Sequence, residues 1–261
     1  MMLPAGIAAH IQGKTGHADT IGMSGSSITV YEDCVLKTET VTPYTQASVD
    51  AMVWLAERLP TPQVLHHEIQ DGVSYLLMHR IPGKMSCDPE YLDNPSLLVS
   101  ALAAGMQLLW QTEAAGCPRV RTLEHLLTEA EYRIDHDLVD MDNVDPETFG
   151  EGGFESPRHL LDWLRENRIE EEPVLTHGDY CLPNVFLLDG RFSGFVDVAD
   201  GGIGEKWRDI ALCYRSLRDN MNGCYGGKSY PDFDPNVLFE ALGIQPDWKK
   251  LRYHLLLDEL F

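Results

Sequence analysis

The stretch LTHGDYCLPNVF, residues 175–186, holds three polar side chains in a fixed frame. His177, Asp179 and Asn184 are separated by a glycine and a proline, the residues that most often mark a defined turn. Such a loop is compatible with a solvated surface turn or with a site that binds a metal ion and phosphate. The rest of the sequence has to distinguish these two interpretations.

A second stretch, GFVDVADGG at residues 194–202, places Asp197 at the end of an apolar run. Together with Asn184 it offers a carboxylate and a neutral amide oxygen, both hard oxygen ligands that suit Mg²⁺. Asp179 is able to orient a hydroxyl group and accept its proton. A metal ion held in this way bridges nucleotide phosphates, and phosphoryl transfer needs mainly positioning and charge compensation.

Length and composition favour a chain with a substantial core. The protein has 261 residues, of which 44% are hydrophobic, enough for one large domain or two modest lobes. No stretch approaches 18 consecutive apolar residues, so we expect no membrane span. The N-terminal residues lack a basic segment that leads into a long apolar one, which argues against a signal peptide.

The charge balance is strongly acidic, with 41 Asp plus Glu against 20 Lys plus Arg and a formal net charge of −21. Such a surface repels nucleic acid and anionic lipid and attracts a cationic partner. A second interpretation is that the charge serves only solubility, and composition alone does not separate the two. Six cysteines without a close pair predict reduced thiols in a cytoplasmic protein.

Hydrophobic periodicity divides the chain into a β-rich beginning and a helical remainder. Residues 26–39 predict a hairpin around Glu32 and Asp33, and residues 72–81 predict a strand. Residues 46–59 carry apolar side chains at helical spacing, and further helical patterns follow at residues 97–112, 123–138 and 160–164. The acidic, Gly- and Pro-rich residues 141–157 predict a loop. We therefore expect lobes at residues 1–80 and 81–261.

The first lobe contains two features of a nucleotide clamp. Lys37 lies in a predicted strand, where its ammonium group is able to meet the α and β phosphates. The small-residue turn at residues 22–27 offers backbone amides that are able to cover them. Each feature alone is common in structural roles, but the ordered set of glycine turn, Lys37, HGD-x4-N and Asp197 is much more specific.

The chain resembles the aminoglycoside 3'-phosphotransferases, small-molecule kinases with the protein-kinase fold. The similarity extends through GMS, PTPQVLHHE and SYLLM, then THGDYCLPNVFLLDGRFSGFVDVADGGIGEKWRDIALCYRSLR, and finally PDWKKLRYHLLLDELF. It implies an α+β fold of two lobes, a small β-rich N-terminal one and a larger helical C-terminal one. It also implies ATP- and Mg²⁺-dependent phosphorylation of a hydroxyl on a cationic aminoglycoside, with resistance as the outcome.

Residue by residue, the resemblance makes Asp179 the catalytic base and Asn184 and Asp197 the magnesium ligands. Lys37 would hold the nucleotide phosphates under a loop that contains Met23 and Ser24. The adenine would meet Val35 and the backbone of the crossover MHRI, in particular His79 and Ile81. A cationic acceptor would be bound by Asp258, Glu259 and the terminal carboxylate of Phe261. We expect Asp258 and Glu259 to face outward and His177 to support the backbone.

Three departures from the family pattern bear on these roles. Kinases of this fold pair the strand lysine with a helix glutamate, but Ser48 occupies that position. Lys37 is then held by Glu39, by Asp50, or only when nucleotide binds. Val35 replaces a tyrosine that stacks on adenine in relatives, which leaves the base preference open. The acceptor segments are also changed: acids are diluted in the loop at residues 147–155, and Lys228 is added after the RSLR motif.

Several functions therefore remain compatible with the sequence. A kinase with the same chemistry could act on another amino-sugar, a basic peptide antibiotic or a metabolite. A nucleotide-binding pseudoenzyme is motivated by the missing glutamate, although all three catalytic polar residues remain. A metal-dependent hydrolase that uses His177, Asp179 and Asp197 fits the resemblance poorly.

Overall fold

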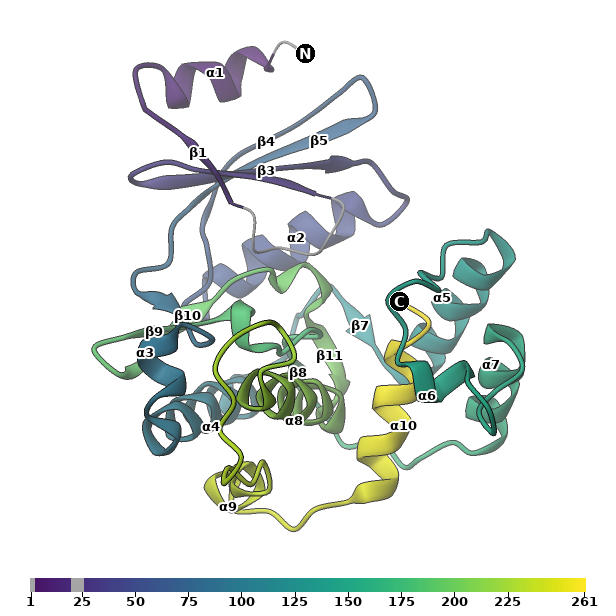
Figure 1. Cartoon of the computed structure of the whole chain (residues 1–261). Coiled ribbons are helices and arrows are strands. Elements are labelled where there is room, and N and C mark those ends of the chain that lie inside the picture. The colour runs from purple at the N-terminus through teal and green to yellow at the C-terminus, as the bar shows by residue number, and fades with distance from the viewer. Residues whose placement is uncertain (1–2, 20–25) are drawn as a thin grey trace.

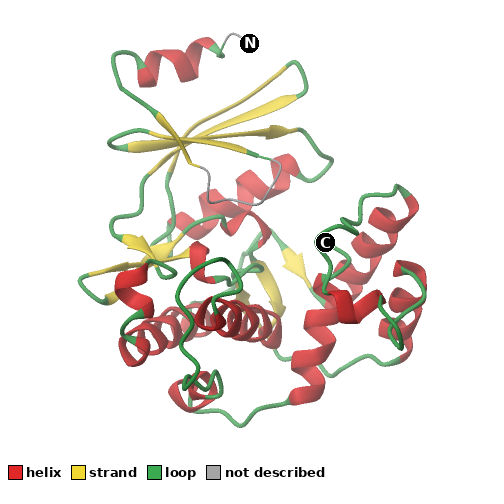
Figure 2. Cartoon of the chain, in the orientation of Figure 1, coloured by secondary structure: helices red, strands yellow, loops and turns green. Residues whose placement is uncertain are grey.

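The computed structural model describes residues 3–19 and 26–261, and it confirms the expected α+β fold of two lobes (Figures 1 and 2). A small lobe built around one β-sheet lies above a larger lobe that is mostly helical. Met23 and Ser24, expected to cover the nucleotide phosphates, lie outside the described residues.

The small lobe contains an antiparallel five-stranded sheet in the order β1-β2-β3-β5-β4. The strands are β1 (His17–Asp19), β2 (Ser27–Val30), β3 (Cys34–Thr40), β4 (Val64–Gln70) and β5 (Val73–His79). The predicted hairpin is confirmed, because β2 pairs with β3 and the N–H of Tyr31 donates to the carbonyl of Cys34 across its turn at 2.8 Å.

Alternation along β5 explains why both faces of the sheet are covered. Tyr75 and Leu77 join a cluster with Ile7 of α1 (Ala5–Ile11), whereas Leu76 and Met78 join the main core with α2 (Thr45–Ala56). Figure 1 shows α1 and α2 on opposite faces of the sheet. The predicted helix at residues 46–59 is confirmed with slightly shifted ends.

The larger lobe confirms the helical patterns and adds one helix within the predicted loop. Its helices are α3 (Pro89–Leu92), α4 (Pro95–Gln111), α5 (Leu123–Asp135), α6 (Pro146–Phe149), α7 (Pro157–Glu166), α8 (Lys206–Asn222), α9 (Val237–Leu242) and α10 (Trp248–Asp258). The loop prediction for residues 141–157 was wrong at α6. There, Asp145 caps the N–H of Glu147 at 2.9 Å, and Pro146 occupies the first helical position.

The larger lobe also contains two small sheets that hydrophobic periodicity did not predict. They bring residues 175–186 close to residues 194–202. One has the order β10-β9-β6 and the other β7-β11-β8. Their strands are β6 (Lys84–Met85), β7 (Val120–Arg121), β8 (Pro173–Thr176), β9 (Val185–Leu188), β10 (Arg191–Phe195) and β11 (Gly202–Glu205). The pairing of Val185 with Phe195 sets Asn184 opposite Val196, whose N–H donates to the Asn184 carbonyl at 2.9 Å. Asn184 and Asp197 therefore lie at the same end of this hairpin.

The main core crosses from one lobe to the other through α2. Val49, Met52 and Leu55 of this helix belong to the same buried cluster as Leu102 of α4 and Ile210 of α8. A separate cluster joins α5, α7 and α10. Among the described residues, no helix combines the length and the apolar character needed to cross a membrane.

Candidate active site

The loop between β8 and the short 3₁₀ helix η1 (Leu182–Asn184) is held by hydrogen bonds to a buried carboxylate. Asp209 of α8 is fully buried and accepts the backbone N–H groups of His177 at 2.7 Å and Gly178 at 2.9 Å. Gly178 has a φ of +89°, and a Cβ there would lie 2.3 Å from the carbonyl oxygen of Asp200. Glycine is therefore required at this turn. Asp209 was missed in the sequence, and so was the helix α8 that carries it, although an acid directly before the apolar run at residues 210–213 was an available signal.

His177 supports the loop and is removed from solvent. Its ring is buried, and Nε2 lies 3.0 Å from the carbonyl oxygen of Val196. The ring also packs edge-on against Tyr180 and Phe195. A histidine enclosed in this way orients the backbone on both sides of the site, which agrees with the role expected from the sequence and disfavours a hydrolase that uses this imidazole.

Asp179 and Asn184 face each other across the loop. The amide Nδ2 of Asn184 donates to Oδ2 of Asp179 at 2.7 Å and to its main-chain carbonyl at 3.0 Å. Because the amide nitrogen is directed at Asp179, the amide oxygen of Asn184 is turned away from it. That orientation leaves a neutral oxygen that is able to bind a cation, while the amide nitrogen holds the carboxylate of Asp179 in place.

Asp197 connects this loop with Lys37 of the small lobe. It adopts a left-handed conformation with φ of +54° at the entry to the 3₁₀ helix η2 (Val198–Asp200). Oδ1 of Asp197 lies 2.9 Å from Nζ of Lys37, and Glu39 Oε2 lies 3.3 Å from the same ammonium group. Burial alone would lower the pKa of Lys37, but these two carboxylates outweigh it and raise the pKa above its usual value.

The open question about the partner of Lys37 is thereby answered within the described residues. Glu39 is one partner and Asp197 is the other, whereas Asp50 accepts from Gln46 at 2.8 Å. Ser48, at the position where a glutamate was expected, accepts a hydrogen bond from Nη1 of Arg119 at 2.8 Å. Arg119 lies outside every motif considered in the sequence.

The donor set fits a magnesium ion that is shared with a nucleotide. Among the described residues no group of three or more His, Cys, Asp or Glu side chains is placed to hold a metal ion. Asn184 and Asp197 would supply two oxygen ligands, and phosphates and waters would complete the octahedron that Mg²⁺ prefers.

The expected adenine edge lies where β5 leaves the sheet. Val35 on β3 pairs with Met78 on β5, and it packs against the main core. The N–H of His79 donates to the Gln63 carbonyl at 2.9 Å. Ile81 is half-buried beside Gly194, where a Cβ would lie 2.9 Å from its Cγ2 atom. The nucleotide contacts of Val35, His79 and Ile81 stay predictions.

The acidic residues near position 258 already have cationic partners, which corrects one expectation. Arg215 of α8 forms an ion pair with Asp258 and lies 3.7 Å from Glu259. The side chain of Glu259 is only 7% exposed, and it accepts the N–H of Asp145 at 2.8 Å, so the outward orientation predicted for it is wrong. Burial raises the pKa of Glu259. Arg133 donates to the main-chain oxygen of Phe261.

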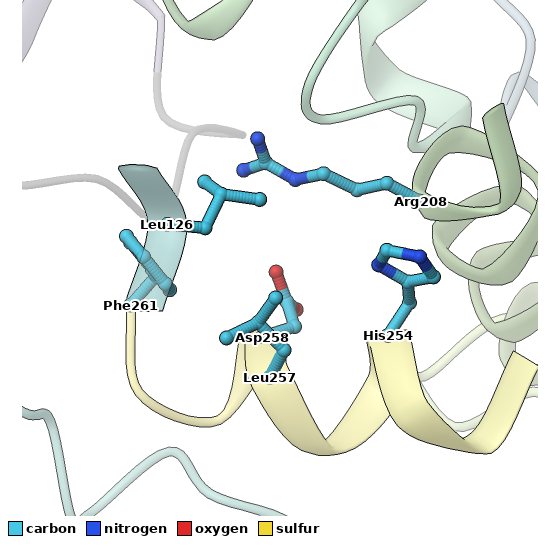
Figure 3. Close-up of a pocket in the computed structure, with 6 residues that line it drawn as sticks. All are labelled: Leu126, Arg208, His254, Leu257, Asp258 and Phe261. Carbon is cyan, nitrogen blue, oxygen red and sulfur yellow. The ribbon is translucent and has the colours of Figure 1, made fainter. Parts of the chain in front are cut away.

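A narrow pocket that Asp258 helps to line lies between α5, α8 and α10 (Figure 3). It is lined by Leu126, Arg208, His254, Leu257, Asp258 and Phe261. Among the described residues, Nη1 of Arg208 and Nδ1 of His254 are buried without a hydrogen-bond partner. The added Lys228 is directed elsewhere, since its Nζ lies 2.6 Å from Asp93. Its charge is therefore paired.

Comparison with known proteins gives a consistent result. Residues 38–252 match the phosphotransferase enzyme family. An aminoglycoside 3'-phosphotransferase of Enterococcus faecalis is 39% identical over 216 residues, covering 81% of this chain and 77% of the relative. One of Campylobacter jejuni is 33% identical and covers 81% of this chain and 79% of the relative.

Solved structures show the same fold. The aminoglycoside phosphotransferase APH(3'')-Id from Streptomyces rimosus superimposes with a TM-score of 0.80 at 22% identity, covering 97% of this chain and 95% of that one. An aminoglycoside-3'-phosphotransferase of type VIII gives a TM-score of 0.78 at 23% identity, covering 98% and 97%. The chain therefore belongs to the phosphotransferase enzyme family, among the aminoglycoside 3'-phosphotransferases.

Proposed function

We propose that the protein transfers the γ-phosphoryl group of ATP to the 3'-hydroxyl of a cationic aminoglycoside and thereby confers resistance. The observation that carries this proposal is the joining of Asp197 to Lys37 beside the hydrogen-bonded pair of Asp179 and Asn184. Relatives named aminoglycoside 3'-phosphotransferase support the acceptor class.

Each residue of the set has a defined task in the transfer. Asp179 accepts the proton of the attacking hydroxyl, whose oxygen forms the new bond to phosphorus while the bond to the β-phosphate oxygen breaks. Asn184 and Asp197 would hold Mg²⁺, which when bound neutralises charge on the phosphates. Lys37 compensates the charge that develops on the ADP leaving group. The buried Asp209 keeps the loop in the geometry that these steps require.

The nucleotide is assigned to the small lobe, with the lobes divided at residues 1–80 and 81–261. Met23 and Ser24 would cover the phosphates, and Val35, His79 and Ile81 would contact the adenine. A cytoplasmic location belongs to the same proposal, because ATP is available there and the six cysteines are free.

The acceptor is assigned to Asp258, Glu259 and Phe261. The net charge of −21 would steer a polycation toward them. Arg215 and Arg133 already compensate these acids, so an acceptor ammonium group has to share or displace a guanidinium contact. Acceptor affinity is thereby lower than three free carboxylates would give.

A second acceptor class is favoured by the altered acceptor segments. Lys228 and Tyr230 both bind Asp93, so the segment after α8 is held by residues that add no free carboxylate. Another amino-sugar or a basic peptide antibiotic would use the same catalytic residues. The experiment below separates these acceptors.

The test is mass spectrometry of an acceptor panel after incubation with ATP and Mg²⁺. The panel should contain two aminoglycosides that differ only in the presence of the 3'-hydroxyl, together with a non-antibiotic amino-sugar and a basic peptide antibiotic. We expect one added phosphoryl group on the 3'-hydroxyl compound and none on its 3'-deoxy counterpart. Equal labelling of both would contradict the 3' assignment, and labelling of the other compounds alone would replace the acceptor class.

A further inference from the structure

The guanidinium group of Arg119 links two segments, α2 and the 3₁₀ helix η2 that follows Asp197; the turn formed by Asp197 and η2 is called the metal-binding turn below. Nη1 donates to Ser48 Oγ on α2 at 2.8 Å and also to the carbonyl oxygen of Ala199 in η2. Nη2 donates to Oδ1 of Asp200 at 3.0 Å. The side chain is only 11% exposed, so these contacts are made away from bulk solvent. Arg119 itself lies just before β7, in the larger lobe.

These contacts continue a chain of interactions that starts at Lys37. Lys37 binds Asp197, Asp197 leads directly into η2, and η2 is held by Arg119, which reaches back to Ser48 on α2. In protein kinases the corresponding helix is coupled to the site by a glutamate that pairs with the strand lysine. Here the serine at that position faces Arg119 instead.

The charges explain why the arrangement is stable. Asp200 accepts from Arg119, Arg121 and Arg208, and these guanidinium groups outweigh burial and hold its pKa well below the usual range. Arg121 also binds Glu129. Of the three arginines, Arg119 is the one for which contacts to both α2 and the main chain of η2 are found among the described residues.

We propose that Arg119 is a positioning residue for phosphoryl transfer, which fixes Asp197 and couples α2 to the metal-binding turn in place of a helix glutamate. This inference rests on the proposed role of Asp197 as a metal ligand. When Arg119 loses its fork of donors, the hydrogen-bonded link between η2 and α2 is lost. The carboxylate of Asp197 is then held less well, and the KM for Mg·ATP and the half-maximal Mg²⁺ concentration should rise while acceptor KM stays constant.

The experiment compares Arg119→Lys with the matched variant Arg121→Lys. Both substitutions keep a charge beside Asp200, and both remove a guanidinium group whose Nη2 donates to it. A purely structural role therefore predicts similar kinetics for the two variants. We expect the KM for Mg·ATP to rise on the order of 10-fold in Arg119→Lys, because losing one charged hydrogen bond changes an affinity by about that factor. In Arg121→Lys the KM for Mg·ATP should rise less than about twofold. Thermal unfolding of both variants shows how much stability each loses.

A double-mutant cycle of Arg119→Lys and Ser48→Ala tests the coupling between these two side chains. Ser100→Ala, on the exposed face of α4, is the control substitution. Ser48→Ala should raise KM for Mg·ATP severalfold in the wild type and have no further effect in Arg119→Lys. Equal KM values in the two arginine variants, or an additive effect of Ser48→Ala, would overturn the proposal. If Arg119→Lys fails to fold, an unchanged KM in Ser48→Ala alone would overturn it. A wild type without kinase activity would instead refute the proposed function.

Discussion

The catalytic loop and the acceptor end are held in different ways. The loop that carries Asp179 rests on Asp209, which is fully buried and accepts two backbone N–H groups. The acids at the acceptor end are held by arginine side chains, and Asp258 and Arg215 each keep a quarter of their surface exposed. Buried hydrogen bonds fix one geometry, whereas partly exposed ion pairs are able to exchange partners. The catalytic loop is therefore rigid, whereas the Asp258–Arg215 contact at the proposed acceptor end is adaptable.

In the catalytic loop, replacing Asp179 by alanine should cause the largest loss of turnover. Loss of a general base typically lowers turnover by about 10²- to 10⁴-fold. Nucleotide affinity should change little, because the proposed role of Asp179 is a contact with the acceptor hydroxyl. Steady-state kinetics and calorimetry with an ATP analogue measure the two quantities. Wild-type turnover in the variant would show that another group accepts the proton.

Neutralising Asp258 and Glu259 together tests the contacts at the proposed acceptor site. Acceptor KM should rise, with each lost contact costing on the order of 1.5–3 kcal/mol if desolvated and less if exposed, while KM for ATP stays nearly constant. Acceptor affinity of the wild type should also fall as salt concentration rises. An unchanged acceptor KM with an intact salt dependence would place the cationic site elsewhere.

Asp209→Asn should destabilise the scaffold under the loop. An amide accepts with one oxygen only, so one of the two N–H groups of His177 and Gly178 loses its buried partner, at about 1–3 kcal/mol. Denaturant unfolding should show that loss together with a lower kcat. Asp219→Asn on the same helix, where the acid pairs locally with Arg218, is the control and should change stability by less. Equal losses would mean that the two loop contacts add nothing.

The raised pKa of Glu259 predicts opposite effects of pH on stability and on acceptor binding. A carboxyl group whose pKa is higher in the folded state contributes stability at low pH that is lost as pH rises through that pKa. Acceptor binding needs the ionised form, so acceptor KM should rise as pH falls through the same range. Glu259→Gln should remove this pH dependence, and an acceptor KM profile identical to wild type would exclude Glu259 from the acceptor site.

Local patterns in the sequence predicted the hairpin and the helices α2, α4, α5 and α7, but not α8. They also indicated the candidate catalytic set, whose roles stay predictions, because hydrophobic periodicity and the HGD-x4-N motif are both short-range signals. The network around Asp200 was missed, since its partners Arg119 and Arg121 lie about 80 residues away in the chain. The same reason explains the error at Glu259: the helix pattern shows which side faces the core but not that Asp145, from a distant loop, covers the carboxylate.

Hydrophobic periodicity could not predict the small sheets of the larger lobe either, because their strands of two to five residues are too short to show a pattern. The sequence left three alternatives for Lys37, namely pairing with Glu39, pairing with Asp50, or being held only when nucleotide binds, and Glu39 proved to be one of its partners. Asp197 could not be foreseen as the other, since strand β3 and the end of β10 meet only when the lobes assemble.

The most direct test of the central claim is the release of ADP from ATP and Mg²⁺, measured with and without a 3'-hydroxyl aminoglycoside. The account predicts ADP release that depends on the aminoglycoside in the wild type and is lost in Asp179→Ala. Release at the same rate without acceptor would indicate a hydrolase, and nucleotide binding without any release across the acceptor panel would indicate a pseudoenzyme. Either result would contradict the assignment of this site as an aminoglycoside kinase.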